Sequence, residues 1–247
     1  MIDSEIKLRI VGCGDAFGSG GRLNTCFYIE ATDTRMLIDC GATSLPGLKK
    51  HDILSEEIDT ILITHFHGDH YGGLPFFLLD AAIHKRQNKL KIISPPGAEE
   101  RVRGLLTLLY PGTEVLEKLD VEFLEYFENK TFHEKHFSIT PYSVVHSEET
   151  LPHGLRIELE GKIISYSGDT SWTDNLIPLS ADADLFICEC NFYNTLAKGH
   201  IAYSELESQL SHLTHKRLLL THFDDEMLNA LDLIPHACAY DGMQIIL

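Results

Sequence analysis

The amino-acid sequence predicts an α/β protein in which two β-sheets pack face to face between outer layers of helices, a four-layer αββα sandwich. Two observations lead to this fold class, and a third indicates the number of domains. Short apolar runs typical of strands recur along the whole chain, and helical segments lie between them. Because each sheet must bury an apolar face, strands that cluster in this way favour two packed sheets with helices outside. The 247 residues contain neither a solenoid-length repeat nor a Pro-, Gly- or Ser-rich linker, so we expect a single domain over 1–247.

The first half of the chain supplies strands expected at 6–11, 26–30, 35–39, 58–64 and 91–94. The run 58–64 is rich in β-branched residues, which is typical of a buried strand. A helix is expected to follow Gly72-Gly73 and to end before Asn88. A second helix is expected at 99–109, where a Pro-Gly pair ends it.

The second half also contains short apolar runs, and strands are expected there at 121–126, 138–145, 155–159, 162–167, 185–189 and 217–221. Gly161 suits the tight turn of a hairpin between two of these strands. A helix expected at 204–213 precedes the last strand. Strands and helices therefore mix in both halves of the chain, as two helix-covered sheets require.

The charge of the chain argues against large nucleic acids as partners. The formal net charge is −17, from 37 acidic and 20 basic residues. Nucleic-acid binding depends on Lys and Arg contacts with phosphates, and the sequence has no dense basic cluster. We therefore do not expect folded nucleic acid as a partner.

The cysteines, the N-terminal residues and the apolar runs together predict the cellular compartment of the protein. The first residues, 1–7, are charged and lack the apolar core of a signal peptide, and the apolar run 74–79 is far shorter than the roughly 18–20 residues of a membrane span. We therefore expect a cytoplasmic protein, with no membrane segment and with six reduced cysteines. Cys188 and Cys190 form a Cys-x-Cys pair, but a zinc site of that kind needs a second pair, and the sequence has none.

Four potential metal ligands directly follow the apolar run 58–64: His65, His67, Asp69 and His70. Four such side chains within six residues, in a loop broken by Gly68, can converge only if the backbone curls around a centre. Imidazole and carboxylate ligands suit Zn²⁺, Mn²⁺ or Fe²⁺ rather than Ca²⁺. A polar loop rich in histidine by chance is the alternative, and the density of ligands disfavours it.

Three more candidate ligands each follow an apolar strand of their own: His146, Asp169 and His222. Any one of them alone is more often a turn carboxylate or a hydrogen-bonded core histidine. Together with the first cluster they make seven ligands, which is enough for two metal ions that share one carboxylate.

These stretches resemble the metallo-β-lactamase superfamily nearly end to end, and most closely its branch of tRNA 3′-processing endonucleases (tRNase Z) and related phosphodiesterases. The motifs that carry the resemblance are 37–41, 64–75, 167–170 and 221–223. The resemblance implies two divalent metal ions, with Zn²⁺ expected and Mn²⁺ or Fe²⁺ as alternatives. It assigns the ligands to two groups bridged by Asp169: His65, His67 and His146 in one, and Asp69, His70 and His222 in the other. Asp39 would orient a ligand imidazole from behind, unless it is a structural turn carboxylate.

A Glu–His pair adds to the resemblance to the endonuclease and phosphodiesterase branch of the superfamily. Glu189 lies in a stretch that resembles the family's His-Glu-Ala-Thr segment, and His200 in one that resembles its Gly-His-Ser-Thr segment, although the neighbouring letters differ. In the endonucleases this pair lies beside the metals, where a protonated imidazole neutralises the transition state or donates to the leaving oxygen. The glutamate would orient that imidazole and raise its pKa. We therefore predict Asp69, Glu189 and His200 as catalytic residues, with an exposed helix-capping histidine as the alternative for His200.

A glycine-rich stretch at 12–21 lacks the Lys-Ser/Thr ending of a P-loop and the spacing of a dinucleotide fingerprint. It resembles the family's opening loop, with Arg22 and Asn24 at its end. Contact with the substrate and simple tight turns both explain its glycines.

The predicted reaction is metal-dependent hydrolysis. Two cations about 3.5–4 Å apart generate a hydroxide and polarise a phosphoryl oxygen, but the fold alone does not choose among phosphodiesters, β-lactams, thioesters and lactones. His200 and Glu189 favour phosphodiesters. In the tRNA endonucleases a long arm that grips tRNA lies between the equivalents of His146 and Asp169, whereas this interval here holds only one hairpin and short flanks.

We therefore predict a small-molecule phosphodiester as the substrate, such as a cyclic nucleotide or a short nucleotide product. A tRNA 3′ endoribonuclease is the first alternative, and a thioesterase of the glyoxalase II type, which would not need His200 as an acid, is the second. A non-catalytic member that only binds metal or a partner is disfavoured by the complete ligand set. The sequence leaves open whether the chain forms a homodimer.

Overall fold

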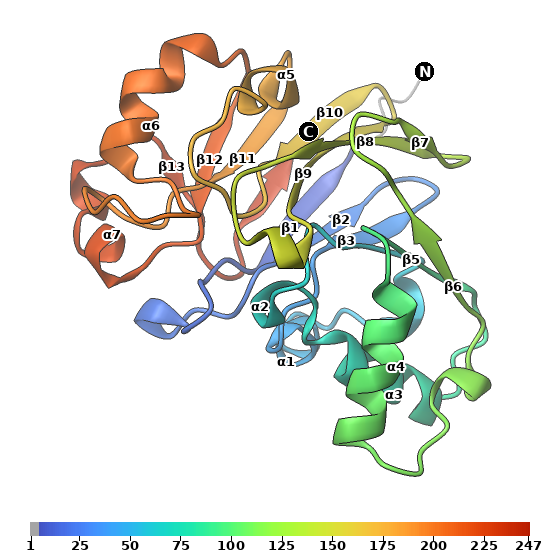
Figure 1. The fold of residues 1–247 in the computed structure, drawn as a ribbon. Helices are drawn as coiled ribbons and strands as arrows, with labels where there is room; N and C mark the ends of the chain where they lie inside the picture. Colours follow the sequence, from blue (N-terminus) through green and yellow to red (C-terminus); the bar gives the residue numbers. More distant parts are fainter. Residues whose placement is uncertain (1–4) are drawn as a thin grey trace.

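Residues 5–247 are described by a computed structural model, in which two β-sheets of seven strands each pack against one another (Figure 1). The first sheet has the order β14-β1-β2-β3-β4-β5-β6 and the second has the order β13-β12-β11-β10-β9-β8-β7. The first sheet consists of β1 (Lys7–Gly12), β2 (Cys26–Glu30), β3 (Arg35–Ile38), β4 (Thr60–Leu62), β5 (Leu90–Ser94), β6 (Val121–Glu125) and β14 (Gln244–Ile246). The second consists of β7 (Phe132–His133), β8 (Phe137–Ser143), β9 (His153–Leu159), β10 (Lys162–Tyr166), β11 (Leu185–Glu189), β12 (Leu218–Thr221) and β13 (Ala237–Cys238).

Helices cover the outer face of each sheet. On the first sheet lie α1 (Ser44–Lys50), α2 (Gly68–Tyr71), α3 (Leu74–Ile83) and α4 (Ala98–Leu109). On the second lie α5 (Leu176–Ser180), α6 (Tyr203–Gln209) and α7 (Asp225–Asn229). The four-layer αββα sandwich expected from the sequence is therefore confirmed (Figure 1).

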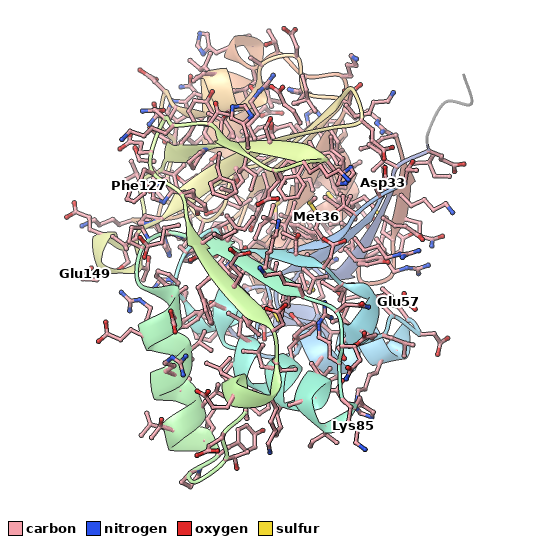
Figure 2. The ribbon with its side chains drawn as sticks, turned by 90° about the vertical axis from the view of Figure 1, so that its right-hand side faces the viewer. Asp33, Met36, Glu57, Lys85, Phe127 and Glu149 are labelled. Carbon is pink, nitrogen blue, oxygen red and sulfur yellow. The ribbon has the colours of Figure 1, made fainter. Side chains whose placement is uncertain are left out.

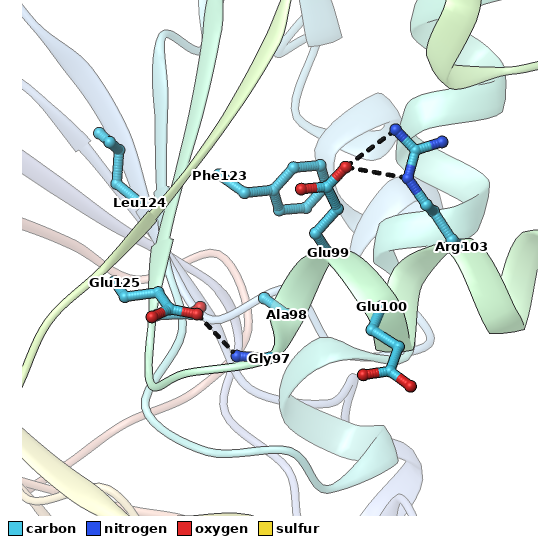
Figure 3. A pocket seen from close by; sticks show the side chains of 9 residues that line it. Gly97, Ala98, Glu99, Glu100, Arg103, Phe123, Leu124 and Glu125 are labelled. Carbon is cyan, nitrogen blue, oxygen red and sulfur yellow. Dashed lines mark hydrogen bonds and ion pairs between the residues drawn. The ribbon is translucent and has the colours of Figure 1, made fainter.

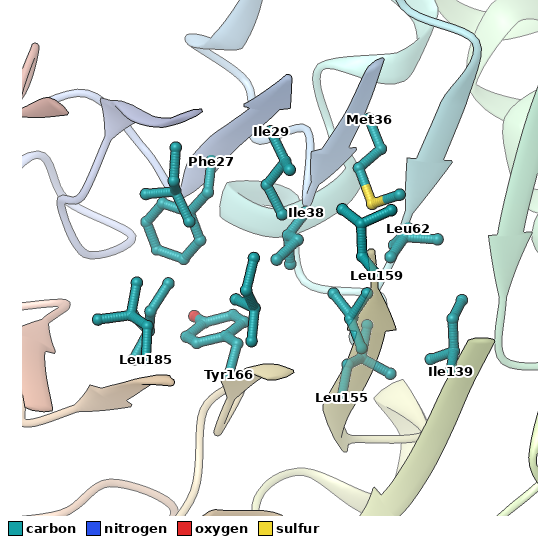
Figure 4. Close-up of a cluster of buried hydrophobic side chains, with 14 of the residues drawn as sticks. Phe27, Ile29, Met36, Ile38, Leu62, Ile139, Leu155, Leu159, Tyr166 and Leu185 are labelled. Carbon is teal, nitrogen blue, oxygen red and sulfur yellow. The ribbon is translucent and has the colours of Figure 1, made fainter. Parts of the chain in front are cut away.

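The core between the sheets follows from the alternation of side chains along each strand. In β2, Phe27 and Ile29 point between the sheets, whereas Cys26 and Tyr28 pack beneath the helices of the first sheet. Figure 4 shows Phe27 above Tyr166, whose rings meet edge to face with their centroids 5.1 Å apart. Strand β2 is thus buried on both faces, as a central strand of a four-layer sandwich must be.

Parallel pairing brings several strand ends together at one edge of each sheet. In the first sheet β3, β4, β5 and β6 run parallel, and in the second β10, β11, β12 and β13 do so. The carboxyl ends of parallel strands form the usual binding crevice of α/β proteins. The loops that leave these ends carry most of the candidate ligands.

Buried charge points to the same place. Charged side chains such as Glu57, Lys85 and Glu149 project from the periphery in Figure 2, while Met36 of β3 lies inside. A group of carboxylates is nevertheless buried near the strand ends: Asp39, Asp69, Asp169 and Glu189. Carboxylates are almost never fully buried without charged or hydrogen-bonding partners, so this group needs an explanation.

The structure differs from the expected elements in a few places. The strand expected at 58–64 is confined to β4 (Thr60–Leu62), because the Thr64 amide donates to the carboxylate of Asp39 instead of continuing the ladder. The helix expected at 204–213 ends as α6 (Tyr203–Gln209), and a 3₁₀ turn, Leu210–His212, follows it. Within residues 5–247, no helix combines the length and the apolar character needed to cross a bilayer.

Candidate metal centre

Seven side chains meet between the two sheets in two overlapping groups, whose ligand atoms lie within 4.8 Å of one another in each group. One group contains His65, His67, His146 and Asp169, and the other contains Asp69, His70, Asp169 and His222. Asp169 belongs to both groups, as the sequence predicts for a bridging carboxylate. Every predicted ligand is therefore in the cluster, although its binding of a metal ion stays a prediction.

The two sheets contribute ligands from opposite sides. The loop after β4 and the single turn of α2 supply His65, His67, Asp69 and His70 from the first sheet. Segments that follow β8, β10 and β12 supply His146, Asp169 and His222 from the second. A centre built in this way is complete only when both sheets are in place.

Close backbone packing fixes the loop that carries four of the ligands. The amide of Cys40 donates to the carbonyl of His70 (2.6 Å), which ties α2 to the end of β3. Gly41 lies so near that a Cβ at its position would sit 2.1 Å from the carbonyl oxygen of Asp69. Only glycine allows this approach, so the Asp-Cys-Gly segment of the sequence serves the ligand loop directly.

The first group has the spacing of ligands around a shared cation. Nδ1 of His67 lies 3.2 Å from Nε2 of His65 and 2.9 Å from Nε2 of His146. Asp169 Oδ2 is 3.9 Å from His65 Nε2 and 4.0 Å from His146 Nε2. Ligand nitrogens of an ideal tetrahedral zinc site, each about 2.0–2.1 Å from the ion, stand roughly 3.3 Å from one another. The imidazoles therefore fit one divalent ion.

The second group contains buried polar atoms that need a partner. His70 Nε2 lies 3.2 Å from Asp169 Oδ1 and 3.3 Å from Asp69 Oδ2. His222 Nε2 lies 3.3 Å from Asp69 Oδ2 and 3.4 Å from Asp169 Oδ2. Within the described part of the chain, His70 Nε2 and Asp169 Oδ1 nevertheless form no hydrogen bond. A cation among these atoms would satisfy both of them.

The protonation of the cluster follows from burial and mutual charge. Burial holds the pKa of His65 well below its ordinary value, so its imidazole is neutral and ready to act as a ligand. Burial opposes the charge of Asp169, but His222 and His70 outweigh this effect and keep the pKa of Asp169 well below its ordinary value. Burial also opposes the protonation of His70 and His222, yet the adjacent Asp169 carboxylate raises the pKa of both. Metal ions entering the second group would have to displace these protons.

Asp39 connects the two groups from behind. Its Oδ2 is 2.7 Å from Nδ1 of His70, and the hydroxyl of Thr64 donates to the same oxygen (2.8 Å). Thr64 Oγ1 also lies 3.1 Å from Nδ1 of His65. Asp39 has a φ of 59° and accepts the Thr64 amide, so it shapes a turn, and it also faces a predicted ligand imidazole. Both interpretations of Asp39 from the sequence therefore agree with the structure.

Glu189 and His200 form a pair at the side of the cluster. His200 Nδ1 lies 3.0 Å from Glu189 Oε1, and the fully buried Glu189 also accepts the amides of Thr170 and Asn191. The His200 ring stacks on that of His222, with centroids 5.5 Å apart. Burial lowers the pKa of His200, but the Glu189 charge outweighs this effect and raises it to about 9. His200 is 22% exposed in a loop before α6, so it is not the exposed helix cap considered as an alternative.

A cavity of about 580 Å³ opens over this cluster. Its wall includes ligands from both groups together with Asp15, Phe17, Asn24, Phe192 and His200. Asn24 thus borders the cavity, which agrees with the interpretation that the glycine-rich stretch 12–21 and the residues at its end contact the substrate. Arg22 is not on the wall: its guanidinium donates to the carbonyl of Ala239 (2.7 Å) and lies 5.2 Å from the ring centroid of Phe223.

A second hollow, of about 500 Å³, lies beside the start of α4 (Figure 3). Glu125 accepts the Gly97 amide there, and Glu99 pairs with Arg103. None of the metal-ligand groups found among residues 5–247 includes a residue of this hollow. The cavity over the histidine cluster is therefore the candidate site.

Two positioning groups were not predicted from the sequence. The side-chain nitrogen of Asn191 donates to the His222 carbonyl (2.8 Å) and lies 3.1 Å from Nδ1 of the same residue. His146 Nδ1 donates to the carbonyl of Gly199 (2.7 Å). Asn191 follows the end of β11, just as the predicted ligands follow other strands. This position in the sequence could have marked it as a candidate site residue. The Gly199 carbonyl could not be predicted in this way, because every residue has a backbone carbonyl.

The fold and this cluster define a metal-dependent hydrolase of the metallo-β-lactamase superfamily, in its ribonuclease Z and phosphodiesterase-like branch. A family model described as Anti-Pycsar protein Apyc1 matches residues 6–234, and the chain belongs to this family.

Individual relatives agree with this assignment. The chain is 27% identical to a ribonuclease Z of Clostridium acetobutylicum, over 88% of either chain, and 27% identical to an Anti-Pycsar protein Apyc1 of Bacillus phage BSP38, over 90% of either chain. Its fold is similar to the crystal structure of the metallo-β-lactamase fold protein YhfI from Bacillus subtilis, with a TM-score of 0.81 and 21% identity. That match covers 99% of this chain and 100% of the other. The superfamily and branch predicted from the sequence are confirmed.

Proposed function

We propose that this protein is a dinuclear phosphodiesterase that hydrolyses a small phosphodiester, with cyclic mononucleotides as the leading candidates. The observation that carries the proposal is the Glu189–His200 pair beside the metal-ligand cluster, in which the buried Glu189 holds His200 and His200 lines the cavity. The Apyc1 and ribonuclease Z relatives support phosphodiester chemistry. A thiolate departs without protonation, so a thioesterase would not need this pair as a proton donor.

The donor set fits two divalent ions, because imidazole and carboxylate atoms converge in two groups that share Asp169. Bound there, two ions, which we expect to be Zn²⁺ with Mn²⁺ or Fe²⁺ as alternatives, would supply a hydroxide nucleophile and polarise a phosphoryl oxygen. Asp69 contributes a carboxylate to the second group and lines the cavity, so it would hold an ion of that group beside the bound phosphate. Asp39 and Asn191 hold His70 and His222 from behind.

His200 supplies the proton for the leaving group. Its Nδ1 is occupied by Glu189, which leaves Nε2 as the nitrogen available to a substrate in the cavity. With a pKa of about 9, the imidazole carries its proton at neutral pH. As the P–O bond breaks, Nε2 gives this proton to the departing oxygen, and Glu189 stabilises the charge before the transfer.

The segment between His146 and Asp169 supports a small substrate. It contains the 3₁₀ turn Glu148–Thr150 and the hairpin of β9 and β10, whose turn places Glu160 and Gly161 at φ values of 50° and 77°. Strand β9 also pairs with β8, and β10 with β11, so the hairpin lies within the second sheet. With no projecting arm in this described segment and a net charge of −17, docking of folded tRNA lacks its usual physical basis.

Substrate assays on metal-reconstituted protein test the proposal. The panel comprises cyclic mononucleotides, a linear dinucleotide, a glutathione thioester and pre-tRNA. We expect hydrolysis of a small phosphodiester, and none in the Asp169→Asn variant. Site-specific removal of a tRNA 3′ trailer at physiological salt would favour the ribonuclease instead, and turnover of the thioester alone would favour the glyoxalase II type. The cytoplasmic location and the assembly state stay predictions.

A further inference from the structure

Phe17 lies almost wholly in solvent at the edge of the candidate site. Its side chain is 93% exposed, yet it lines the same cavity as His67, His146 and His200. A single exposed apolar side chain is common on a protein surface, but one that lines a cavity offers a ligand a large aromatic surface to cover. Phe17 is therefore available for contact with a ligand that enters the cavity.

The loop that carries Phe17 is held in a fixed shape. The buried carboxylate of Asp15 accepts the amides of Phe17 (3.1 Å) and Ser19 (2.9 Å) and the hydroxyl of Ser19 (2.7 Å). Gly18 follows Phe17 with a φ of 68°, a conformation that glycine adopts without strain. Asn24 also donates to the Asp15 carbonyl (3.0 Å). These bonds pre-organise Phe17 over the cavity, which lowers the entropy lost when a ligand binds.

A second aromatic side chain lines the cavity from the second sheet. Phe192 follows β11, and its backbone pairs with Ala202 in an isolated bridge. Its ring lies 6.3 Å from that of His200, so it is adjacent to the predicted proton donor. Phe17 and Phe192, here called the aromatic rim, thus come from separate loops and border one opening over the metal-ligand cluster.

We propose that the aromatic rim stacks on the nucleobase of the substrate while the phosphodiester lies over the metal-ligand cluster. This inference rests on the proposed function and narrows it to phosphodiesters that carry a base. A cavity of about 580 Å³ falls within the usual range for small-molecule sites, roughly 300–1,000 Å³. Stacking on aromatic rings tolerates every base, because each base has a π-face. The aromatic rim therefore predicts a preference for nucleotides over base-free esters, with little discrimination among bases.

Steady-state kinetics of Phe17→Ala test the inference. Loss of one stacking partner should raise KM for purine and pyrimidine cyclic mononucleotides at least about 5-fold. The kcat should change little, because the lost contact is equal in the ground and transition states. KM for the corresponding base-free sugar cyclic phosphate should not change. Phe17→Trp, which keeps a stacking surface, should retain the wild-type KM.

Phe127→Ala is the matched control, because Phe127 is also an exposed phenylalanine (51%) but lies outside the cavity wall, at the periphery in Figure 2. It should leave every parameter unchanged. The side chain of Phe17 makes so little contact with the fold that its removal should also leave the unfolding temperature unchanged, which thermal melts would check.

Several outcomes would overturn the inference. An unchanged KM for nucleotides in Phe17→Ala, or an equal rise for the base-free ester, removes the stacking role and leaves the proposed phosphodiesterase intact. Hydrolysis of base-free phosphodiesters alone by the metal-loaded wild-type protein removes the stacking role, whereas hydrolysis of no phosphodiester at all removes the proposed function as well. If Phe17→Ala converts a dimer to a monomer in size-exclusion chromatography while KM stays constant, the occupant of Phe17 is a second copy of the chain.

Discussion

Nδ1 of His146 donates a 2.7 Å hydrogen bond to the backbone carbonyl of Gly199, the residue directly before His200. One peptide unit therefore joins a predicted metal ligand to the loop of the predicted proton donor. The contact is tight, because a Cβ on Gly199 would lie 2.7 Å from His146 Nδ1, and Gly199 has a φ of 91°. The metal centre and the proton donor are thus positioned by the same short segment.

Gly199→Ala should disturb the centre through this contact. The left-handed backbone alone should cost about 1–3 kcal/mol of unfolding free energy, and the added methyl group must in addition displace the His146 ring. Gly97→Ala is the control, because Gly97 has a similar φ of 92° but its Cβ would meet nothing within 4 Å. Denaturant unfolding should show a cost in both variants, whereas elemental analysis should show metal loss only in Gly199→Ala. Equal metal content in the two would separate Gly199 from the centre.

The ligand arrangement predicts two transition-metal ions per chain, measured by elemental analysis after reconstitution. Asp169→Ala should lose both ions together, since its carboxylate belongs to both groups. His222→Ala should mainly weaken the ion of the second group and keep the other. One ion or fewer in the reconstituted wild-type protein, or a single loss in Asp169→Ala, would contradict a shared carboxylate.

His200→Ala should retain both ions and slow the hydrolysis of an unactivated phosphodiester by roughly 10²- to 10⁴-fold, the usual span of general acid catalysis. The loss should be much smaller with a p-nitrophenyl ester, because p-nitrophenolate leaves without a proton. Glu189→Gln should share this phenotype more weakly. An equal loss with both esters would indicate charge stabilisation in place of proton donation, and no loss with either would remove His200 from the mechanism.

The raised pKa of His200 also predicts the pH profile. The acid form is the active form, so kcat/KM should fall as the pH rises through the pKa of about 9. Glu189→Gln removes the charge that raises this pKa, so the fall should move to lower pH. The pair should also stabilise the fold fully below the ordinary histidine pKa of about 6.5 and lose this effect as the pH passes about 9. A profile that does not move in Glu189→Gln would contradict the assignment.

The sequence predicted most strands and named all seven side chains that the structure brings together in the cluster, because both depend on local patterns. An apolar run that ends in histidine or aspartate marks a strand end, and parallel strand ends meet in space. Short elements such as β13 (Ala237–Cys238) and β14 (Gln244–Ile246) escape prediction, since two or three residues hold no period. The position of Phe17 at the cavity was not predicted either, because the sequence of a loop does not reveal whether its aromatic side chain is buried or in solvent.

The division of the ligands between the two sheets has a consequence for folding. His70 and His222 come from different sheets, so ions bound between them would act as a non-covalent cross-link across the inter-sheet core. A ligand held only by the native state stabilises it in proportion to the logarithm of its free concentration, by about 4 kcal/mol at 1,000 times its dissociation constant. Chelation should therefore lower the unfolding temperature and speed amide hydrogen exchange in β4 and β12 together. In a cell, the lifetime of this chain would then depend on the free metal concentration as well as on its sequence.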